Sequence, residues 1–427
     1  MRLGGRLAAA IDILHDIETR HRPASDAMRD WGLSHRFAGA GDRAAIGNFV
    51  YDALRHRRGA ALAYGEETPR GLAIGGHLLE TGSTPEELNK ALAGDRFAPP
   101  LLSAEELLAL NTRLEEARTG PISANVPEWC EPLMREAFSE AWAEEGTALA
   151  GRPPLDMRAN RLKAPREKVL TALSHTGAQA ATLASSGVRI PPVAGNGRHP
   201  NVQVQPAFRK GWFEVQDEGS QVVAELTGAA PGEQILDFCA GAGGKTLAIS
   251  AMMENKGQIH AYDADRHRLA PIFDRLKRAG CRNVQVVANE AALAPLEGRM
   301  DLVVVDAPCT GSGTWRRRPD AKWRLTAQQL EARMTEQRAI LDAAARYVRP
   351  GGRLVYITCS VFRQENTAQA EALTARMPDF SPADHRATWR RYFPAHEDMA
   401  RLEKWGITLT PARTQTDGFY FATLKRG

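Results

Sequence analysis

The second half of the chain repeats one pattern, in which a short continuous apolar run is followed by a stretch with helical periodicity. The runs EQILDFCA, GQIHAYDA, NVQVVAN, DLVVVDAP and RLVYITCS begin at residues 233, 257, 283, 301 and 353. Strands that are apolar on both faces are typical of parallel sheets covered by helices on both sides. The pattern therefore predicts a doubly wound α/β domain over residues 226–427.

The first part of the chain has the period of helices. Apolar residues recur at spacings of three and four in RLAAAIDILHDI, DRAAIGNFVYDALR and PLMREAFSEAWAEE. Pro and Gly residues, including Gly75-Gly76, separate such stretches, and STPEEL and SAEELLAL begin with capping boxes. We expect an all-α bundle of five to seven helices over residues 1–147. Residues 148–225 mix the helical PREKVLTAL with the strand-like GVRIPP and GWFEV, which predicts a small α+β module.

Charge is divided unevenly along the chain. Residues 1–150 carry 16 basic and 23 acidic side chains, whereas the remainder carries 39 basic and 28 acidic ones. A basic catalytic half suits a polyanion such as nucleic acid, although an ordinary solvated surface explains the charge equally well. No apolar run approaches the ~18 residues of a membrane span, so we expect a cytoplasmic protein without membrane contact. The five cysteines stand apart, which predicts neither a disulfide framework nor a metal site.

The segment LDFCAGAGGKT, residues 236–246, leads from an apolar run through glycines into a helix. Such loops lie at the carboxyl ends of strands, where glycine lets a cofactor approach the backbone. A phosphate-binding loop would need glycine at Cys239, and a dinucleotide loop would need glycine at Thr246. The candidate cofactor-binding residues are Cys239, Ala240, Gly241, Ala242, Gly243, Gly244 and Lys245.

Asp263 ends the next apolar run, where a carboxylate accepts hydrogen bonds from a ribose diol. The loop and this acid suit the adenosine of S-adenosylmethionine or of NAD, and we favour S-adenosylmethionine. An NAD-linked oxidoreductase would need the missing third glycine and a hydride-transfer site that the sequence does not display. A purely structural turn is the remaining alternative.

Two cysteines, Cys309 and Cys359, each follow the carboxyl end of an apolar run, in DLVVVDAPCTGSGTW and LVYITCSVFRQEN. A lone cysteine is usually a small buried hydrophobe, but two at the same sheet edge are expected to face one pocket. A following helix start would lower the thiol pKa and raise the thiolate fraction. Cys130 and Cys281 lack this setting and are expected to be packing residues.

A thiol beside a methyl donor suits methylation of carbon-5 of cytosine. This carbon is a poor nucleophile until a thiolate adds to carbon-6, and covalent catalysis of this kind divides one difficult step into two. A second thiol, or a water that it positions, would then remove the carbon-5 proton. Asp306 could hydrogen-bond the cytosine edge, or it could merely cap its loop.

The loop TWRRRPDAKWR, residues 314–324, interleaves basic and aromatic side chains. We expect it to contact phosphates and stacked bases, with a solvated charge run as the alternative.

At these motifs the chain resembles the RNA cytosine-5 methyltransferases, specifically the bacterial RsmB/Sun (Fmu) 16S rRNA branch. The family motifs CAAPGGKT, DAPCSGTG with RRxPDxKW, and TCS with EN stand here as CAGAGGKT, DAPCTGSG with RRRPDAKW, and TCS with Glu365-Asn366. RANRLK, FEVQDEGSQ and TDGFYFATL are similar to the flanking parts of the family's catalytic region, and FAGAGDRAAIGNFVYDALRHRR to its NusB-like RNA-binding domain.

The resemblance implies a Rossmann-like methyltransferase domain in which Cys359 is the nucleophile and Cys309 assists product release. Residues 239–245, Asp263 and Asp306 would line the cofactor and base pocket. Two departures stand out: Ala242 replaces the loop proline, and Asn289 or Glu290 stands where the family has an acid. An asparagine there would hydrogen-bond the adenine amino group.

Taken together, the sequence predicts a monomeric S-adenosylmethionine-dependent RNA cytosine-5 methyltransferase that acts on 16S rRNA. Another site in rRNA, or tRNA, is the alternative substrate. A catalytically inactive RNA-binding ribosome assembly factor is the alternative function, but a pure binding protein has no use for two reactive thiols.

Overall fold

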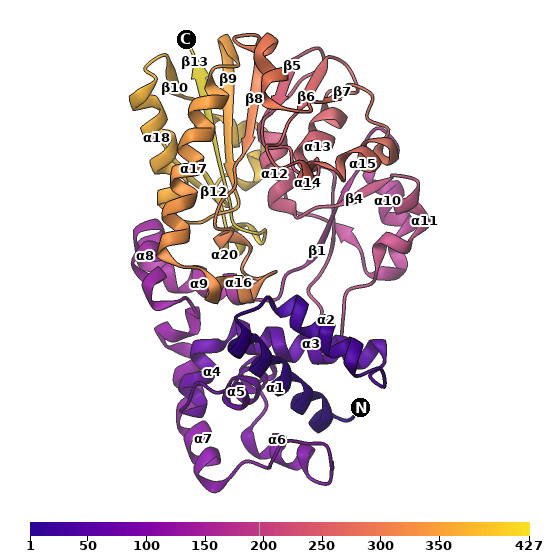
Figure 1. Cartoon of the computed structure of the whole chain (residues 1–427), viewed down its shortest axis with the longest axis vertical. Helices are drawn as coiled ribbons and strands as arrows, with labels where there is room; N and C mark the ends of the chain where they lie inside the picture. The colour runs from indigo at the N-terminus through magenta and orange to yellow at the C-terminus, as the bar shows by residue number, and fades with distance from the viewer. Residues whose placement is uncertain (196) are drawn as a thin grey trace. The chain divides into compact units, whose positions relative to one another are not determined.

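The computed structural model drawn in Figure 1 describes residues 1–195 and 197–427. These residues form two units by their internal contacts. The first comprises Met1–Arg152, Val193–Arg198 and Trp315–Leu325, and the second comprises Pro153–Pro192, His199–Thr314 and Thr326–Gly427. The segment predicted as a separate α+β module, residues 148–225, lies mostly within the second unit. The boundaries of the three predicted domains stay a prediction.

The first unit is helical, as predicted. Its helices are α1 (Leu3–Arg20), α2 (Ala24–Ser34), α3 (Ala40–Arg55), α4 (Arg57–Tyr64), α5 (Pro69–Thr81), α6 (Pro85–Leu92), α7 (Ala104–Thr119), α8 (Glu131–Phe138), α9 (Trp142–Ala150) and α16 (Pro319–Arg324). Short 3-10 turns η1 (Pro121–Ala124), η2 (Glu128–Cys130) and η3 (Ser139–Ala141) join some of them. Within residues 1–152 the helices outnumber the five to seven expected, because breaks such as Ser139, at φ 52°, divide predicted stretches.

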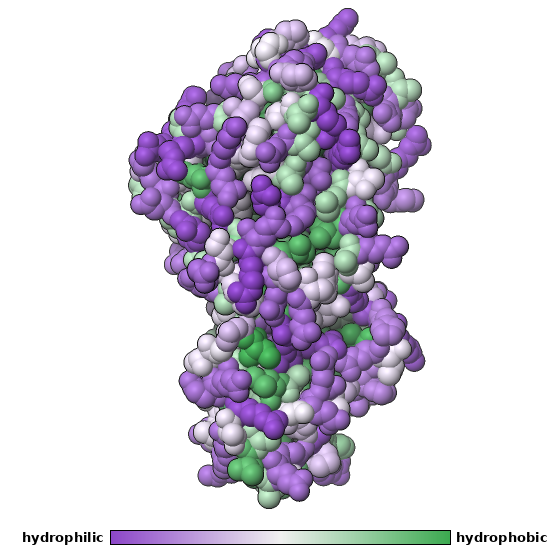
Figure 2. Space-filling view, turned by 90° about the vertical axis from the view of Figure 1, so that its left-hand side faces the viewer, coloured by the Kyte–Doolittle hydropathy of each residue, from purple (hydrophilic) through white to green (hydrophobic). Residues whose placement is uncertain are grey.

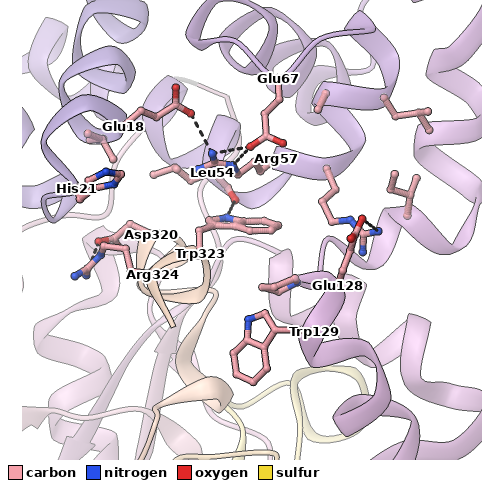
Figure 3. A pocket seen from close by; sticks show the side chains of 16 residues that line it. Glu18, His21, Leu54, Arg57, Glu67, Glu128, Trp129, Asp320, Trp323 and Arg324 are labelled. Carbon is pink, nitrogen blue, oxygen red and sulfur yellow. Dashed lines mark hydrogen bonds and ion pairs between the residues drawn. The ribbon is translucent and has the colours of Figure 1, made fainter. Parts of the chain in front are cut away.

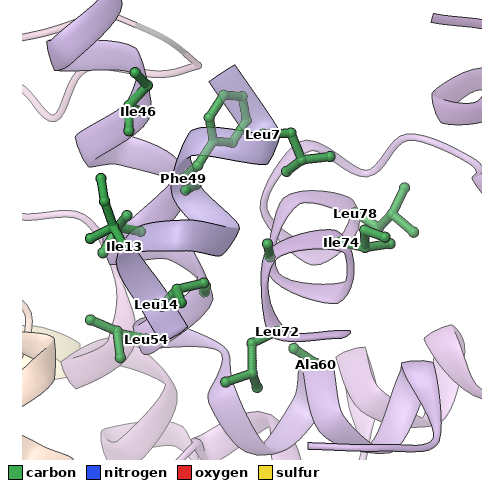
Figure 4. Close-up of a cluster of buried hydrophobic side chains, with 14 of the residues drawn as sticks. Leu7, Ile13, Leu14, Ile46, Phe49, Leu54, Ala60, Leu72, Ile74 and Leu78 are labelled. Carbon is green, nitrogen blue, oxygen red and sulfur yellow. The ribbon is translucent and has the colours of Figure 1, made fainter. Parts of the chain in front are cut away.

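The core of this unit is built from the apolar faces of α1, α3, α4 and α5. Figure 4 shows Leu7, Ile13 and Leu14 among the side chains that pack there. The prediction that Gly75-Gly76 ends a helix is wrong, since α5 runs through both. A Cβ atom at Gly76 would lie 2.6 Å from the Cα of Ala53, so glycine allows α5 to approach α3 closely.

The loop predicted to contact RNA contributes instead to the first unit. Trp315, Arg316 and Lys322 are buried, which contradicts their predicted exposure to phosphates and bases. Arg55 donates to the carbonyl of Arg316 at 2.8 Å, and Trp323 Nε1 donates to the carbonyl of Leu54 at 2.6 Å. These contacts satisfy polar groups that would otherwise be buried without partners. Trp315, Arg316 and Lys322 are therefore packing residues, whereas Arg318 and Arg324 of the same loop are exposed and their contact with phosphates stays a prediction.

The second unit contains two sheets. The smaller has the antiparallel order β2-β3-β1-β4, with β1 (Leu155–Ala159), β2 (Gln179–Ala180), β3 (Gly187–Ile190) and β4 (Phe213–Val215). Helices α10 (Arg166–Ala172) and α11 (Pro206–Arg209) accompany it, with the turns η4 (Ser174–Thr176) and η5 (Val202–Val204). Met157, Val169 and Phe213 belong to the buried cluster that joins these elements. The mixed α+β character predicted for this stretch is confirmed.

The larger sheet has nine strands in the order β11-β12-β13-β9-β8-β5-β6-β7, with β10 paired to β13. Strands β5 (Gln234–Asp237), β6 (Gln258–Ala261), β7 (Val284–Val286), β8 (Met300–Asp306) and β9 (Val348–Thr358) are parallel to their neighbours in this group. Strands β10 (Phe380–Pro382), β11 (Arg401–Glu403), β12 (Gly406–Leu409) and β13 (Phe419–Arg426) pair antiparallel.

Helices cover both faces of the larger sheet, as expected for a doubly wound fold. Alternate residues of β8 belong to different clusters: Val303 and Val305 pack with α17 and α18, whereas Leu302 and Val304 pack with α12, α13 and α19. The remaining elements are α12 (Glu218–Leu226), α13 (Gly244–Met252), α14 (Arg266–Leu269), α15 (Ile272–Ala279), α17 (Ala327–Ala345), α18 (Thr367–Arg376), α19 (His385–Tyr392), α20 (Pro411–Thr414), η6 (Glu290–Leu296), η7 (Ser312–Thr314), η8 (Arg363–Glu365) and η9 (Pro394–His396). The Rossmann-like prediction is confirmed.

The C-terminal strands extend the sheet beyond β9. The segment GITLTP followed by GFYFATLKR predicts an antiparallel pair at the sheet edge, and β12 and β13 do form such a pair, but β13 lies between β9 and β12, and the edge strand is β11. Residues 419–424 of β13, FYFATL, are all buried, which explains the interior place of this strand.

The molecular surface is mostly polar on the face drawn in Figure 2, where hydrophobic residues appear in separate groups. Among the described residues, none of the helices has both the length and the apolar character needed to cross a membrane.

Candidate active site

A cavity of about 600 Å³ opens in the second unit, next to the residues that follow β5, β8 and β9. Ligands bind at this edge because the carboxyl ends of parallel strands and their loops converge there. The volume is within the range of small-molecule sites. The cavity is lined by Val215, Gln216, Ser220, Cys239, Ala240, Gly241, Ala242, Gly244, Lys245, Arg268, Arg275, Asp306, Ala307, Pro308, Cys309, Arg333 and Cys359.

The structure brings the two cysteines that follow β8 and β9 into contact. The Sγ atoms of Cys309 and Cys359 lie 3.3 Å apart, and both residues line the cavity. Parallel pairing of β8 with β9 places the ends of these strands together, so residues 50 positions apart become neighbours. The Gly313 amide donates to the carbonyl of Cys359 at 2.9 Å, which links the two loops.

The electrostatic setting of the two thiols differs from the prediction for Cys309. Its hydrogen bond to Cys359, its burial and the negative charge of Glu365 raise the pKa of Cys309 well above its ordinary value. No helix starts directly after Cys309 to oppose this, since the following turn, η7, begins at Ser312. The thiolate form of Cys309 is therefore disfavoured, while either sulfur can be the donor in the contact between the two thiols.

Asp306 ends β8 and forms an ion pair in the same cavity. Lys245 Nζ lies 2.9 Å from Asp306 Oδ2 and 2.8 Å from Ser220 Oγ, and it stands 5.2 Å from the centre of the Phe419 ring. The ammonium holds Asp306 in place, so the carboxylate is oriented by a charge rather than by its own loop. The Asp306 carboxylate is therefore a fixed hydrogen-bond acceptor in the cavity that the two thiols line.

The glycine loop is shaped by a neighbouring carboxylate. Asp263 accepts hydrogen bonds from the Gly241 amide at 2.8 Å and from the Asp265 amide at 2.9 Å. Gly243 has φ 85°, and a Cβ atom there would lie 2.6 Å from Ile272 Cγ1, so no larger residue fits. Asp263 therefore stabilises the conformation of the glycine loop through these two backbone hydrogen bonds.

Arg275 contacts Ala242, which stands where the family that the sequence resembles has proline. Its Nη1 donates to the carbonyl of Ala242 at 2.7 Å, while its Nη2 pairs with Glu214 on β4 at 3.1 Å. A side chain from α15 therefore holds the carbonyl of Ala242 in place.

The predicted residues do not all reach the cavity. Cys239, Ala240, Gly241, Ala242, Gly244, Lys245 and Asp306 line it together with the two cysteines. Gly243, Asp263 and Asn289 are not among the lining residues. Asn289 is exposed and accepts a hydrogen bond from the Ala292 amide at 3.1 Å as the cap of η6.

Sequence reasoning missed several lining residues, among them Gln216, Ser220, Arg275 and Arg333. The segment FEVQDEGSQ contained the first two, and its resemblance to the family was the available signal. Arg275 and Arg333 carry no such signal, because they are single basic residues on amphipathic helices.

A larger cavity of about 1110 Å³ lies in the first unit. Figure 3 shows that its charged residues are paired: Arg57 Nη2 lies 3.1 Å from Glu18 and 2.6 Å from Glu67. No cysteine is among its lining residues, and the arginines already have carboxylate partners. The cavity therefore offers neither a nucleophile nor an unpaired cationic cluster. In the described part of the chain, no group of three or more histidine, cysteine or acidic side chains could hold a metal ion.

Comparison with known proteins agrees with the geometry of the second unit. Residues 226–425 match the family model described as 16S rRNA methyltransferase RsmB/F. The ribosomal RNA small subunit methyltransferase B of Cronobacter sakazakii is 31% identical over 320 residues, which cover 73% of this chain and 70% of that protein. The chain belongs to the RsmB/F family. The expected resemblance is thereby confirmed.

Other members of the RsmB/F family give similar matches. The ribosomal RNA small subunit methyltransferase B of Klebsiella pneumoniae is 32% identical over 303 residues, covering 70% of this chain. The matched region spans 65% of that relative's length.

Solved structures share the fold of this RsmB/F protein. PH0851 has a TM-score of 0.72 at 24% identity, covering 100% of this chain and 99% of its own. NSun6 from Pyrococcus horikoshii, solved with SFG, has a TM-score of 0.60 at 22% identity, covering 70% of this chain and 98% of its own.

Proposed function

We propose that this protein transfers a methyl group from S-adenosylmethionine to carbon-5 of a cytosine in RNA. The contact between the sulfurs of Cys309 and Cys359, beside Asp306, is the observation that carries the proposal. Two thiols in one polar cavity suit covalent activation of a pyrimidine and release of the product. The names of the relatives support 16S rRNA as the substrate.

The residues of the cavity fit the proposed cofactor. The glycine loop leaves its backbone accessible between Cys239 and Lys245, and Asp263 stands behind it. A Cβ atom at Gly241 would make only ordinary van der Waals contacts, with Arg268 Nη2 at 3.7 Å and Asp263 Oδ2 at 3.9 Å. When bound there, S-adenosylmethionine supplies the methyl group for carbon-5.

Cys359 is the nucleophile, and its thiol releases its proton to solvent as the sulfur attacks. Its sulfur forms a bond to carbon-6 of cytosine, which moves electron density onto carbon-5 so that this carbon accepts the methyl group. Asp306, held by Lys245, accepts a hydrogen bond from the cytosine edge and fixes the base against the thiol.

Cys309 then assists the release of the product. A water that it orients takes the proton from carbon-5, the double bond between carbon-5 and carbon-6 reforms, and the Cys359 sulfur departs. The protonated Cys309 thiol, 3.3 Å away, donates a hydrogen bond to the departing thiolate. Without that donor, release should be slower than addition.

The substrate is proposed to be RNA on the basis of charge as well as relatives. The chain beyond residue 150 has 39 basic and 28 acidic side chains, and phosphate neutralisation supplies much of nucleic-acid affinity. A catalytically inactive assembly factor is disfavoured because such a protein needs no pair of contacting thiols.

The test is transfer of labelled methyl groups from S-adenosylmethionine to an unmodified 16S rRNA transcript, followed by mapping of 5-methylcytosine. A tRNA transcript in parallel distinguishes the alternative substrate. We expect Cys359→Ala to abolish transfer and Cys309→Ala to accumulate a protein–RNA complex that resists denaturant. Cys281→Ala, away from the cavity, is the matched control and should leave turnover unchanged. Normal turnover by Cys359→Ala would overturn the mechanism.

A further inference from the structure

Glu365 is a buried carboxylate that contacts the residue following each of the two thiols. Its side chain accepts hydrogen bonds from the Thr310 amide at 2.8 Å and from Thr310 Oγ1 at 2.5 Å. It also accepts one from Ser360 Oγ at 2.5 Å. Thr310 follows Cys309 and Ser360 follows Cys359, so a single anion joins the two loops.

The acceptor capacity of this carboxylate is filled by neutral donors. Oε1 receives the Thr310 amide and, at 3.0 Å, the side-chain amide of Gln337, while Oε2 receives the two hydroxyls. Gln337 also donates to the carbonyl of Pro308 at 2.9 Å, which extends the network to the residue before Cys309. An ionised carboxylate accepts only, and it therefore matches four surrounding donors.

Hydrogen bonds from strand β9 fix the backbone around Glu365. Tyr356 on β9 donates its hydroxyl to the carbonyl of Glu365 at 2.6 Å. The next residue, Asn366, accepts from Thr358 Oγ1 at 2.5 Å and donates to the carbonyl of Ser360 at 2.9 Å. The carboxylate is thus fixed relative to the end of β9, and a fully connected buried network of this kind is rigid.

We propose that Glu365 is a positioning residue, which holds the two thiols in contact and supplies the negative charge that keeps Cys309 a hydrogen-bond donor to Cys359. This role rests on the cysteine chemistry proposed above. Glu365 does not line the cavity and so acts through Thr310 and Ser360 rather than on the substrate.

The negative charge of Glu365 acts on the pKa of Cys309 in the direction that this role requires. A buried negative charge disfavours a second one nearby, and Glu365 is among the causes that raise the pKa of Cys309. The other ionisable groups around Cys309 are Cys359, Tyr356 and, lining the same cavity, Cys239, Lys245, Arg268, Arg275, Asp306 and Arg333. Lys245 is already paired with Asp306. Glu365 is therefore the carboxylate whose removal should change Cys309 most.

The substitution Glu365→Gln separates charge from shape. Its oxygen can still accept from the Thr310 amide and Gln337, and its NH₂ group faces two hydroxyls that can rotate to accept. The network is retained while the charge is lost. We expect the pH midpoint for alkylation of Cys309 by iodoacetamide, followed by peptide mass spectrometry, to fall by about one pH unit or more. We also expect kcat for methyl transfer to fall roughly tenfold, with KM for S-adenosylmethionine changed less than about twofold.

The matched control is Glu371→Gln on α18, where the side chain is 52% exposed and should change neither measurement. An unchanged Cys309 alkylation profile in Glu365→Gln overturns the electrostatic role. The alkylation readout needs no RNA, so it tests Glu365 even if transfer to cytosine proves absent. Transfer by Cys359→Ala, in contrast, refutes the underlying reaction.

Measurements on a second variant and on the natural protein test the proposal even if Glu365→Gln does not fold. Thr310→Val removes one hydroxyl donor and keeps the charge, so kcat should fall while the alkylation midpoint of Cys309 stays in place. A normal kcat in Thr310→Val overturns the positioning role. In the unmodified protein, Cys309 should react more slowly than Cys359 from about pH 6 to about pH 9, and equal rates would contradict the assignment of the donor.

Discussion

Lys322 is a buried base whose removal should stabilise the protein in acid. It lies on α16 with 1% of its surface exposed, and its Nζ stands 4.7 Å from the Trp323 ring and 5.9 Å from the Trp315 ring. Burial, with a smaller contribution from Arg55, lowers the pKa of Lys322 from 10.5 to about 7. We predict that Lys322→Met stabilises the first unit at low pH.

The sign and the size of this effect on the free energy of unfolding follow from the difference in proton binding between the folded and the unfolded chain. Between about pH 7 and about pH 10.5 the unfolded chain binds a proton that the folded chain does not, so stability rises with pH across this window. The full penalty, about 5 kcal/mol, is present well below pH 7. At about pH 9.5 it falls to roughly 1 kcal/mol. Methionine fills similar volume and loses the cation–π contacts, which contribute about 0.5 to 2 kcal/mol.

Urea unfolding of the whole protein at about pH 6 and about pH 9.5 measures the difference in free energy of unfolding between Lys322→Met and the natural protein. We expect the free energy of unfolding of Lys322→Met to exceed that of the natural protein by about 3 kcal/mol at the lower pH and by about 1 kcal/mol at the higher one. Lys90→Met, at an exposed position on α6, is the control and should show no such dependence. A difference that is the same at both pH values would refute the reasoning.

Three further results are expected. Gly243→Ala should weaken S-adenosylmethionine binding at least tenfold by equilibrium dialysis, because its Cβ would lie 2.6 Å from Ile272; unchanged affinity would contradict the close packing. Burial raises the pKa of Asp237 to about 7, so stability should fall as pH rises from about 4 to about 7; Asp237→Asn should remove that slope in thermal unfolding. A peroxide should oxidise the Cys309 and Cys359 thiols to a disulfide, with two waters formed, and abolish transfer until dithiothreitol restores it; inactivation that dithiothreitol cannot reverse would argue against the contact.

Local patterns in the sequence were sufficient for the architecture and for the position of the site. The apolar runs identified the parallel strands, because a strand buried on both faces must be apolar throughout. The same runs located Asp306, Cys309 and Cys359, since residues that follow parallel strands meet at one edge. The helical period identified the first unit but overestimated its breaks at Gly75-Gly76, where glycine serves close packing instead.

Only the tertiary structure decided which side chains meet. The sequence shows a basic, aromatic loop at residues 314–324, yet Arg316 and Lys322 are buried because residues more than 250 positions earlier, such as Leu54, pack against this loop. Glu365 and Thr310 are 55 positions apart, and no periodicity relates them. Periodicity reports whether a residue faces the core, whereas hydrogen bonds, ion pairs and pKa values depend on neighbours supplied by distant segments. Those neighbours exist only once the chain has folded.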